Sequence, residues 1–169
     1  MGDKPGEMTS GMAEPENTRK NISDKISFEE YLEKYGSLTY TNVGVSMMPL
    51  LRQGRDMFIL RKKQPDERCK AGDVVLYRRP PDQYVLHRVA EVRPADYVIL
   101  GDNCINKEYG IKDADILGVM TGFVRNGKEH SVDSGGYRLY SYVWMHTSGP
   151  RIACKRTAIH LKRWLRGIV

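Results

Sequence analysis

The chain has 169 residues, of which 40% are hydrophobic, and its 27 Lys and Arg against 21 Asp and Glu give a formal net charge of +6. This length suffices for one domain with a hydrophobic core, and because no long apolar run is present we expect neither a secretory leader nor a membrane-spanning helix. The three cysteines include no CxxC pair, which argues against a zinc ribbon, and their odd number argues weakly against a disulfide-bonded secreted domain. We therefore expect a cytoplasmic protein without metal or cofactor.

The N-terminal part predicts a tail followed by one short helix. Residues 1–22 are rich in Gly, Pro, Glu, Asn and Thr without hydrophobic periodicity, which is typical of a disordered tail. Ser27 and Glu30 have the spacing of a capping box, and the apolar side chains that follow Ser27 fall on one helical face. Gly36 is suited to end this helix, so we expect it over residues 28–35.

From residue 38 onward, short β-type runs alternate with turn residues. The expected strands are 38–43, 57–61, 73–77, 84–92, 97–100 and 116–125. Asn126-Gly127 predicts a type I′ hairpin turn, after which 129–132 can pair back. The pattern indicates a mainly β domain of short antiparallel strands over 23–133, with its leading helix.

Residues 134–169 predict a helical extension with helices over 137–145 and 151–165, separated by Pro150. The second helix mixes apolar side chains with many Lys and Arg. One interpretation is a helix that packs its apolar face on the β domain and leaves its basic residues in water. The other is a basic amphipathic helix that lies on an anionic membrane surface.

Ser46 stands between Val45 and two methionines, and Pro49 follows shortly after. Because proline cannot continue a helix or a central strand, the chain must turn just after the serine. A serine on a tight turn can hold its hydroxyl at an exposed edge beside backbone N–H groups, which places a nucleophile and an oxyanion site together. An ordinary turn serine is the alternative, and it is the commoner one for a lone serine.

His87 lies in the middle of the run YVLHRVAEV, where alternation puts it on one face with Val85 and Val89. A neutral imidazole in that position is either a buried structural histidine or a general base. Gly101-Asp102-Asn103 follows the next strand; this is ordinary turn chemistry that also supplies an acid able to orient the histidine. Further acids downstream are Glu108, Asp113 and Asp115.

Four short blocks stand in a specific order along the β domain. They are Ser46-Met47-Met48-Pro49-Leu50, Gly72-Asp73-Val74-Val75, His87-Arg88-Val89 and Gly101-Asp102-Asn103. Taken together, over roughly residues 43–124, these blocks resemble the type I signal peptidases and the related self-cleaving peptidases of the SOS-repressor type. The third block resembles the branch of the superfamily in which histidine replaces lysine as the general base.

This resemblance implies a serine endopeptidase of the β-rich signal-peptidase fold, which cleaves a leader or precursor peptide through an acyl-enzyme. It implies Ser46 as the nucleophile, with its backbone amide as one oxyanion donor, and His87 as the general base. The candidate supporting or orienting acids are Asp102, Glu108 and Asp113, with Glu108 slightly preferred. The candidate oxyanion and substrate-cleft residues are Gly44, Val45, Met47 and Pro49. At Gly44, many signal peptidases carry a serine whose hydroxyl helps to hold the oxyanion, and that donor is missing here.

Two other functions remain open. A catalytically silent peptide-binding or regulatory module of the same fold could hold an extended peptide by strand addition, although the presence of both Ser46 and His87 argues against it. The second open function is self-cleavage, as in the repressor-type relatives. The sequence argues against it, because no Ala-Gly or Cys-Gly cleavage site precedes Ser46. The expected partner is a peptide or protein substrate. An anionic membrane surface is a second candidate partner, and no nucleic acid is expected because the basic surplus is small.

Overall fold

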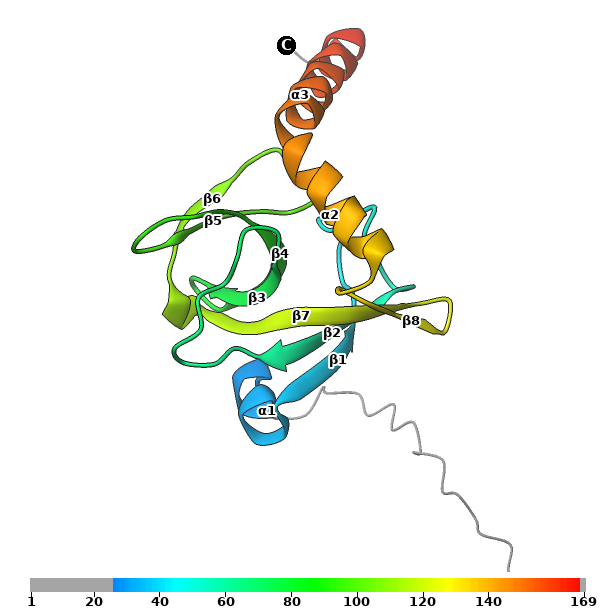
Figure 1. Ribbon diagram of the computed structural model, residues 1–169. Helices are drawn as coiled ribbons and strands as arrows, with labels where there is room; N and C mark the ends of the chain where they lie inside the picture. The colour runs from blue at the N-terminus through cyan, green and yellow to red at the C-terminus, as the bar shows by residue number, and fades with distance from the viewer. Residues whose placement is uncertain (1–25, 168–169) are drawn as a thin grey trace, which may run out of the picture.

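The computed structural model describes residues 26–167, so the tail expected over 1–22 lies outside the described residues. Its centre is an eight-stranded sheet in which all paired strands are antiparallel. The strands are β1 (Ser37–Thr41), β2 (Met57–Lys62), β3 (Val74–Arg79), β4 (Gln83–Val92), β5 (Tyr97–Leu100), β6 (Glu108–Ile111), β7 (Ile116–Arg125) and β8 (Lys128–Ser131). They are arranged in the order β1-β2-β7-β3-β4-β5-β6, and β8 pairs with β7. The predicted fold, mainly β with flanking helices, is confirmed (Figure 1).

Helix α1 (Phe28–Tyr35) forms as predicted, and both of its ends are fixed by local contacts. The Ser27 hydroxyl accepts a hydrogen bond from the Glu30 amide at 3.1 Å, and the Glu30 carboxylate accepts one from the Ser27 amide at 3.0 Å. Gly36 ends the helix in the left-handed region, with φ of 72°. The buried Leu32 side chain packs α1 against the sheet.

Alternation along the strands divides the core into two hydrophobic clusters on opposite faces of the curved sheet. On β3, Val74 belongs to the first cluster and Val75 to the second. On β4, Leu86 belongs to the first and Val89 to the second. The alternation predicted for β4 is therefore confirmed, and His87 lies on the face of the second cluster.

The β7–β8 hairpin turns at Asn126 and Gly127, whose φ angles of 51° and 75° are those of the predicted type I′ turn. Strand β6 was not predicted. It has only four residues, one of them Gly110 with φ of 78°, and so it lacks the alternation by which the longer strands are recognised. A short 3₁₀ helix, η1 (Asp113–Asp115), joins β6 to β7.

Helices α2 (Gly135–His146) and α3 (Ser148–Leu165) follow the sheet. The prediction that Pro150 separates them is wrong: they meet at Thr147, and Pro150 lies in the first turn of α3, where the proline nitrogen needs no helical partner. Helix α2 packs on the first cluster through Tyr137 and Tyr140. Figure 1 shows α3 projecting away from the sheet. The expectation that its apolar face packs on the β domain is therefore wrong for its last turns, where Trp164 is 68% exposed.

Within residues 26–167, none of the helices combines the length and the apolar composition that a bilayer crossing requires.

Candidate active site

Ser46 lies in the loop between β1 and β2, and buried neighbours hold this loop in place. The Asn42 side chain, 4% exposed, donates from Nδ2 to the carbonyl of Gly44 at 3.1 Å and to that of Leu51 at 3.5 Å. Gly44 takes a φ of 89°, in the left-handed region that favours glycine. The chain thus turns at the serine loop, as the sequence predicts, and leaves Ser46 half-buried.

The loop after β5, which carries Gly101-Asp102-Asn103, contacts the serine loop directly. The backbone amide of Asn103 donates to the carbonyl of Ser46 at 2.7 Å, and its Nδ2 donates to the carbonyl of Val45 at 3.0 Å. Among the described residues, neither the amide nor the hydroxyl of Ser46 has a hydrogen-bond partner. Both groups are therefore available to a ligand, one as an oxyanion donor and the other as a nucleophile.

His87 is held by contacts on its Nδ1 side. The side chain is 6% exposed on β4, and Val75 of β3 is its cross-strand partner. Its Nδ1 lies 3.4 Å from the Tyr77 hydroxyl and 3.4 Å from Oε1 of Glu108. The same Glu108 oxygen lies 3.2 Å from Nη1 of Arg79. These contacts orient the ring through Nδ1 and leave Nε2 as the nitrogen that can exchange a proton with a substrate or a nucleophile.

The surroundings of His87 favour its neutral form. Burial lowers the pKa of His87 from 6.5, and this effect outweighs the nearby Glu108 carboxylate, which raises it. The imidazole is consequently unprotonated at neutral pH, as a general base must be. Burial, together with the charge of Glu108, raises the pKa of Tyr77, so that its hydroxyl keeps its proton and can donate to the Glu108 carboxylate.

Because Gly101 has no side chain, the Nε2 side of the His87 imidazole can pack against its backbone. A Cβ placed on Gly101 would lie 2.8 Å from Nε2 of His87 and 2.7 Å from Sγ of Cys104. Any side chain at this position would displace one of the two groups. Burial raises the pKa of Cys104 and keeps its sulfur as the thiol, which is the less nucleophilic form.

Ser46 and His87 line one cavity of about 860 Å³. Its walls come from the serine loop, from β3 and β4, from the loop that follows β5, and from α3, which contributes Lys155 and Ile159. Arg79 and Glu108 also line it. A cavity of this volume lies in the range of ligand-binding sites and is large enough for one ligand to contact both residues.

Asp102, a candidate orienting acid, is paired with Arg88 rather than with His87. The two side chains, 1% and 2% exposed, form a bidentate ion pair with both N–O distances at 2.8 Å. Tyr140 of α2 donates to the same carboxylate at 2.9 Å. Burial alone would lower the pKa of Arg88, but hydrogen bonds and charge from Asp102 raise it above its usual value. Asp102 therefore links the loop after β5 to α2, and it acts on His87 only through its charge.

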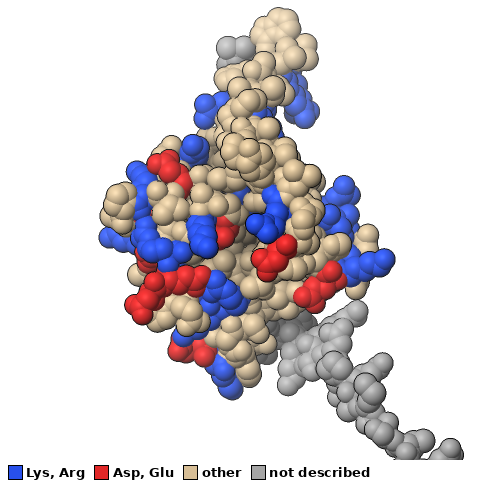
Figure 2. Space-filling model, viewed as in Figure 1, with Lys and Arg blue, Asp and Glu red and all other residues tan. Residues whose placement is uncertain are grey.

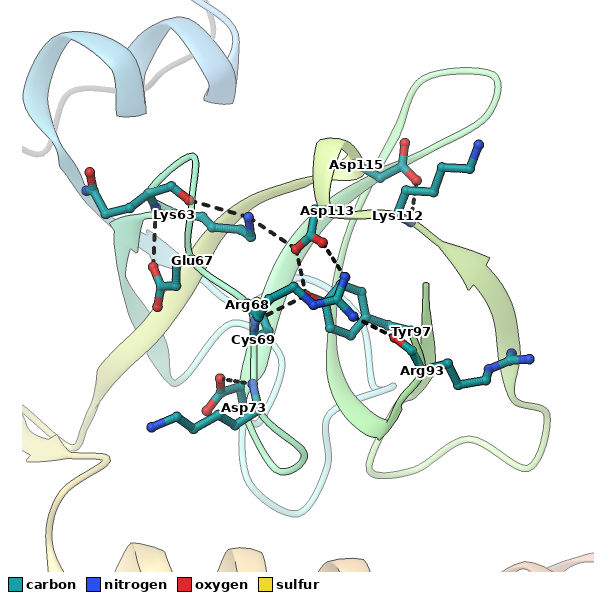
Figure 3. A network of polar contacts seen from close by, with 12 residues as sticks. Lys63, Glu67, Arg68, Cys69, Asp73, Arg93, Tyr97, Lys112, Asp113 and Asp115 are labelled. Atoms are coloured by element: carbon teal, nitrogen blue, oxygen red, sulfur yellow. Dashed lines mark hydrogen bonds and ion pairs between the residues drawn. The ribbon is translucent and has the colours of Figure 1, made fainter. Parts of the chain in front are cut away.

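Asp113, the third candidate acid, belongs to a different polar network (Figure 3). Its carboxylate pairs with Arg68 at 2.5 Å and with the buried Lys63 at 3.3 Å, and it accepts a hydrogen bond from Tyr97 at 2.6 Å. The Tyr97 hydroxyl in turn accepts from the amide of Cys69 at 3.1 Å. This network joins the β2–β3 loop to β5 and η1. Of the three acids, Glu108 alone contacts the His87 ring.

The residues predicted to form the substrate cleft take separate positions. Met47 is 1% exposed and packs in the first hydrophobic cluster. Gly44 and Val45 precede the serine in its loop, and Val45 is 53% exposed. Pro49 lines two smaller cavities on the side of α2 and α3. None of the four lines the 860 Å³ cavity, whose wall on this side is formed by Asn42, Val43 and Ser46.

No group of three or more His, Cys, Asp or Glu side chains in the described part of the chain is placed to hold a metal ion. Comparisons with protein-family models, with curated proteins and with solved structures each find no match. The function is therefore inferred from the residues and their geometry.

Sequence reasoning missed several residues of the site, and for one of them the sequence carries a usable signal. The hairpin between β3 and β4 places Tyr77 two residues from Val75, the cross-strand partner of His87, on the same face of the sheet. The two-residue alternation of both strands could have identified it. Asn42, Gly101 and Lys155 act through loop and helix contacts that have no comparable pattern.

Proposed function

We propose that this chain is a serine endopeptidase that cleaves a leader or precursor peptide with Ser46 and His87. The observation that carries the proposal is that both side chains line one cavity, while Glu108 and Tyr77 contact the imidazole on its Nδ1 side. The order of the four sequence blocks, which resembles that of the signal peptidases with a histidine base, supports the same function.

In the proposed reaction, Nε2 of His87 accepts the hydroxyl proton of Ser46 as Oγ bonds to the substrate carbonyl carbon. The carbonyl becomes an oxyanion, to which the amide of Ser46 donates. When the C–N bond breaks, the leaving amine takes the proton from His87, and the acyl group remains on Oγ. Water then attacks the ester, His87 accepts its proton, and the C–O bond to Ser46 breaks to release the carboxylic acid and restore the hydroxyl.

Glu108 and Tyr77 are positioning residues in this scheme. The Glu108 carboxylate accepts the proton of Nδ1 and keeps it on that nitrogen, so that Nε2 carries the free electron pair, and Tyr77 donates to the same carboxylate. The Glu108 carboxylate also stabilises the imidazolium that forms after proton transfer. Arg79 contacts the same carboxylate at 3.2 Å and holds Glu108 in place.

A peptide library incubated with four proteins tests the proposal: the wild type, Ser46→Ala, Cys104→Ala and, as a control on β1, Ser37→Ala. New peptide termini are identified by mass spectrometry. We expect cleavage by the wild type and by the Ser37 and Cys104 variants, and loss of at least 1000-fold in Ser46→Ala.

Cleavage that persists in Ser46→Ala but disappears in Cys104→Ala would transfer the nucleophile to the thiol beside His87 and overturn the proposal. If no protein cleaves any peptide and peptides are nevertheless retained equally by the wild type and Ser46→Ala, the chain is a peptide-binding module.

A further inference from the structure

The net positive charge of the chain arises from the region of helices α2 and α3. From residue 135 to residue 167 there are seven Lys and Arg and no Asp or Glu. The remainder of the chain has 20 basic and 21 acidic residues and is thus nearly neutral. Figure 2 shows this difference: Lys and Arg alternate with Asp and Glu over the body, whereas the projecting end of α3 shows basic and uncharged side chains only.

Helix α3 uses one of its faces to contact the body. Arg151 donates to the carbonyl of Asp102 at 3.1 Å, Lys155 donates to Oδ1 of Asn103 at 2.6 Å, and Ile159 lines the 860 Å³ cavity. These contacts recur at intervals of four residues and define one side of the helix. The contact ends after Ile159, and all later residues of the helix are exposed.

A second side of α3, turned by roughly 120° about the helix axis from the contact face, is apolar and bare. We call this face the outer stripe; its members recur at intervals of three and four and are Cys154, Thr157, Ala158, Leu161, Trp164 and Leu165. Leu161 is 55% exposed, and Trp164 and Leu165 are each 68% exposed. Helix α2 likewise exposes Leu139 and Tyr142, at 65% and 62%. Large apolar side chains gathered at such exposure mark an interaction surface.

We infer that the outer stripe of α3 docks on an anionic lipid surface. The charge selects this partner: the helix presents apolar side chains together with Lys162, Arg163 and Arg166 and has no acidic residue to repel lipid phosphates. Leu161, Trp164 and Leu165 enter the boundary between headgroups and acyl chains, and the long basic side chains reach the phosphates beside the helix.

Docking in this way places the 860 Å³ cavity next to the membrane. Ile159 contacts the cavity from α3, and Leu161 of the outer stripe follows two residues later on the same helix, roughly 3 Å further along its axis. A peptide held at the membrane surface can therefore reach the cavity. The docking itself does not rest on the proposed peptidase activity.

Vesicle co-sedimentation tests this inference with the full chain. The protein is mixed with vesicles of phosphatidylcholine alone or with 30% phosphatidylglycerol, at low and high salt. We expect binding to the anionic vesicles only, weakened by salt. Each basic residue near an anionic surface changes the partition coefficient by about fivefold, so the triple change of Lys162, Arg163 and Arg166 to Gln should reduce binding by about 100-fold. The matched control changes Lys34, Lys112 and Lys128 to Gln and should bind like the wild type.

Trp164 supplies a second readout that does not depend on the basic residues. In Trp144→Phe, which leaves Trp164 as the only tryptophan, its fluorescence should shift to the blue on addition of anionic vesicles. Trp164→Ser should lower binding at least tenfold without affecting thermal unfolding, because this side chain is exposed.

Three results would overturn the inference. The first is equal binding to neutral and anionic vesicles. The second is full binding by the triple Gln variant of α3. The third is no binding to anionic vesicles; if the protein is then a dimer in solution that Trp164→Ser dissociates, the outer stripe contacts a second copy of the chain.

Discussion

Removing one partner of the buried ion pair between Arg88 and Asp102 should destabilise this fold more than breaking any other polar contact of the site. Both side chains are at most 2% exposed, and their bidentate geometry has both distances at 2.8 Å. In Asp102→Asn the amide group directs an N–H toward one of the guanidinium nitrogens, and Arg88 becomes a buried charge without a counterion. Breaking one partner of such a pair costs about 3–5 kcal/mol. That is a large share of the roughly 5–15 kcal/mol by which a domain is stable.

Urea unfolding followed by circular dichroism measures this cost. The double variant Arg88→Met with Asp102→Leu removes both charges and should recover at least half of the loss, because apolar side chains of similar volume replace the pair. Glu33→Gln breaks the Lys62–Glu33 pair, whose carboxylate is 72% exposed, and should cost less than about 1 kcal/mol.

The opposite outcome is equally clear. If the free energy of unfolding of Asp102→Asn lies within about 1 kcal/mol of the wild-type value but the variant cleaves no peptide, Asp102 acts on His87 rather than as an anchor. The assignment of its role from the ion pair would then be wrong.

The remaining predictions concern the geometry of the site. Because burial lowers the pKa of His87 from 6.5, kcat/KM should be constant at neutral pH and fall only as the pH drops below 6.5. Glu108→Gln removes a charge that raises this pKa and should move the fall in kcat/KM to lower pH. A fall in kcat/KM centred above pH 7 would contradict the assignment of His87 as the base. Gly101→Ala should displace the imidazole and lower kcat by at least tenfold with an unfolding cost of about 1–3 kcal/mol, whereas unchanged kcat would show that Nε2 does not act from its observed position. Asn103→Ala removes a hydrogen bond to the serine loop; it should lower kcat about tenfold and the free energy of unfolding by about 1 kcal/mol. Equal circular dichroism spectra of the variant and the wild type would confirm that the fold is intact.

The sequence predicts most of this fold because its signals are local. The capping box at Ser27 and Glu30, the hairpin turn at Asn126 and Gly127, and the alternation around His87 each depend on a few neighbouring residues, and each is present in the structure. Strand β6 and the exact break between α2 and α3 were missed because pairing with β5 and the contact of Arg151 with the loop after β5 fix them, and neither leaves a periodic pattern.

The site was less predictable than the fold, for the same reason. Ser46 and His87 could be singled out as chemically unusual for their positions, but their neighbours come from distant segments. Glu108 reaches His87 from a strand with no clear pattern, and Asp113 is drawn into ion pairs with Lys63 and Arg68 that no spacing indicates. The choice among three acids therefore required coordinates.

The most direct test of the central claim is the mass of the protein during turnover. A library peptide that the wild type cleaves is mixed with the wild-type protein, and the reaction is quenched with acid within seconds. The masses of the intact protein and of its tryptic peptides are then measured by mass spectrometry. We predict a mass increase equal to the acyl fragment of the peptide, located on the tryptic peptide that contains Ser46 and absent from Ser46→Ala. An acyl group on Cys104, or cleavage without any adduct in the wild type while Ser46→Ala remains active, would contradict the account.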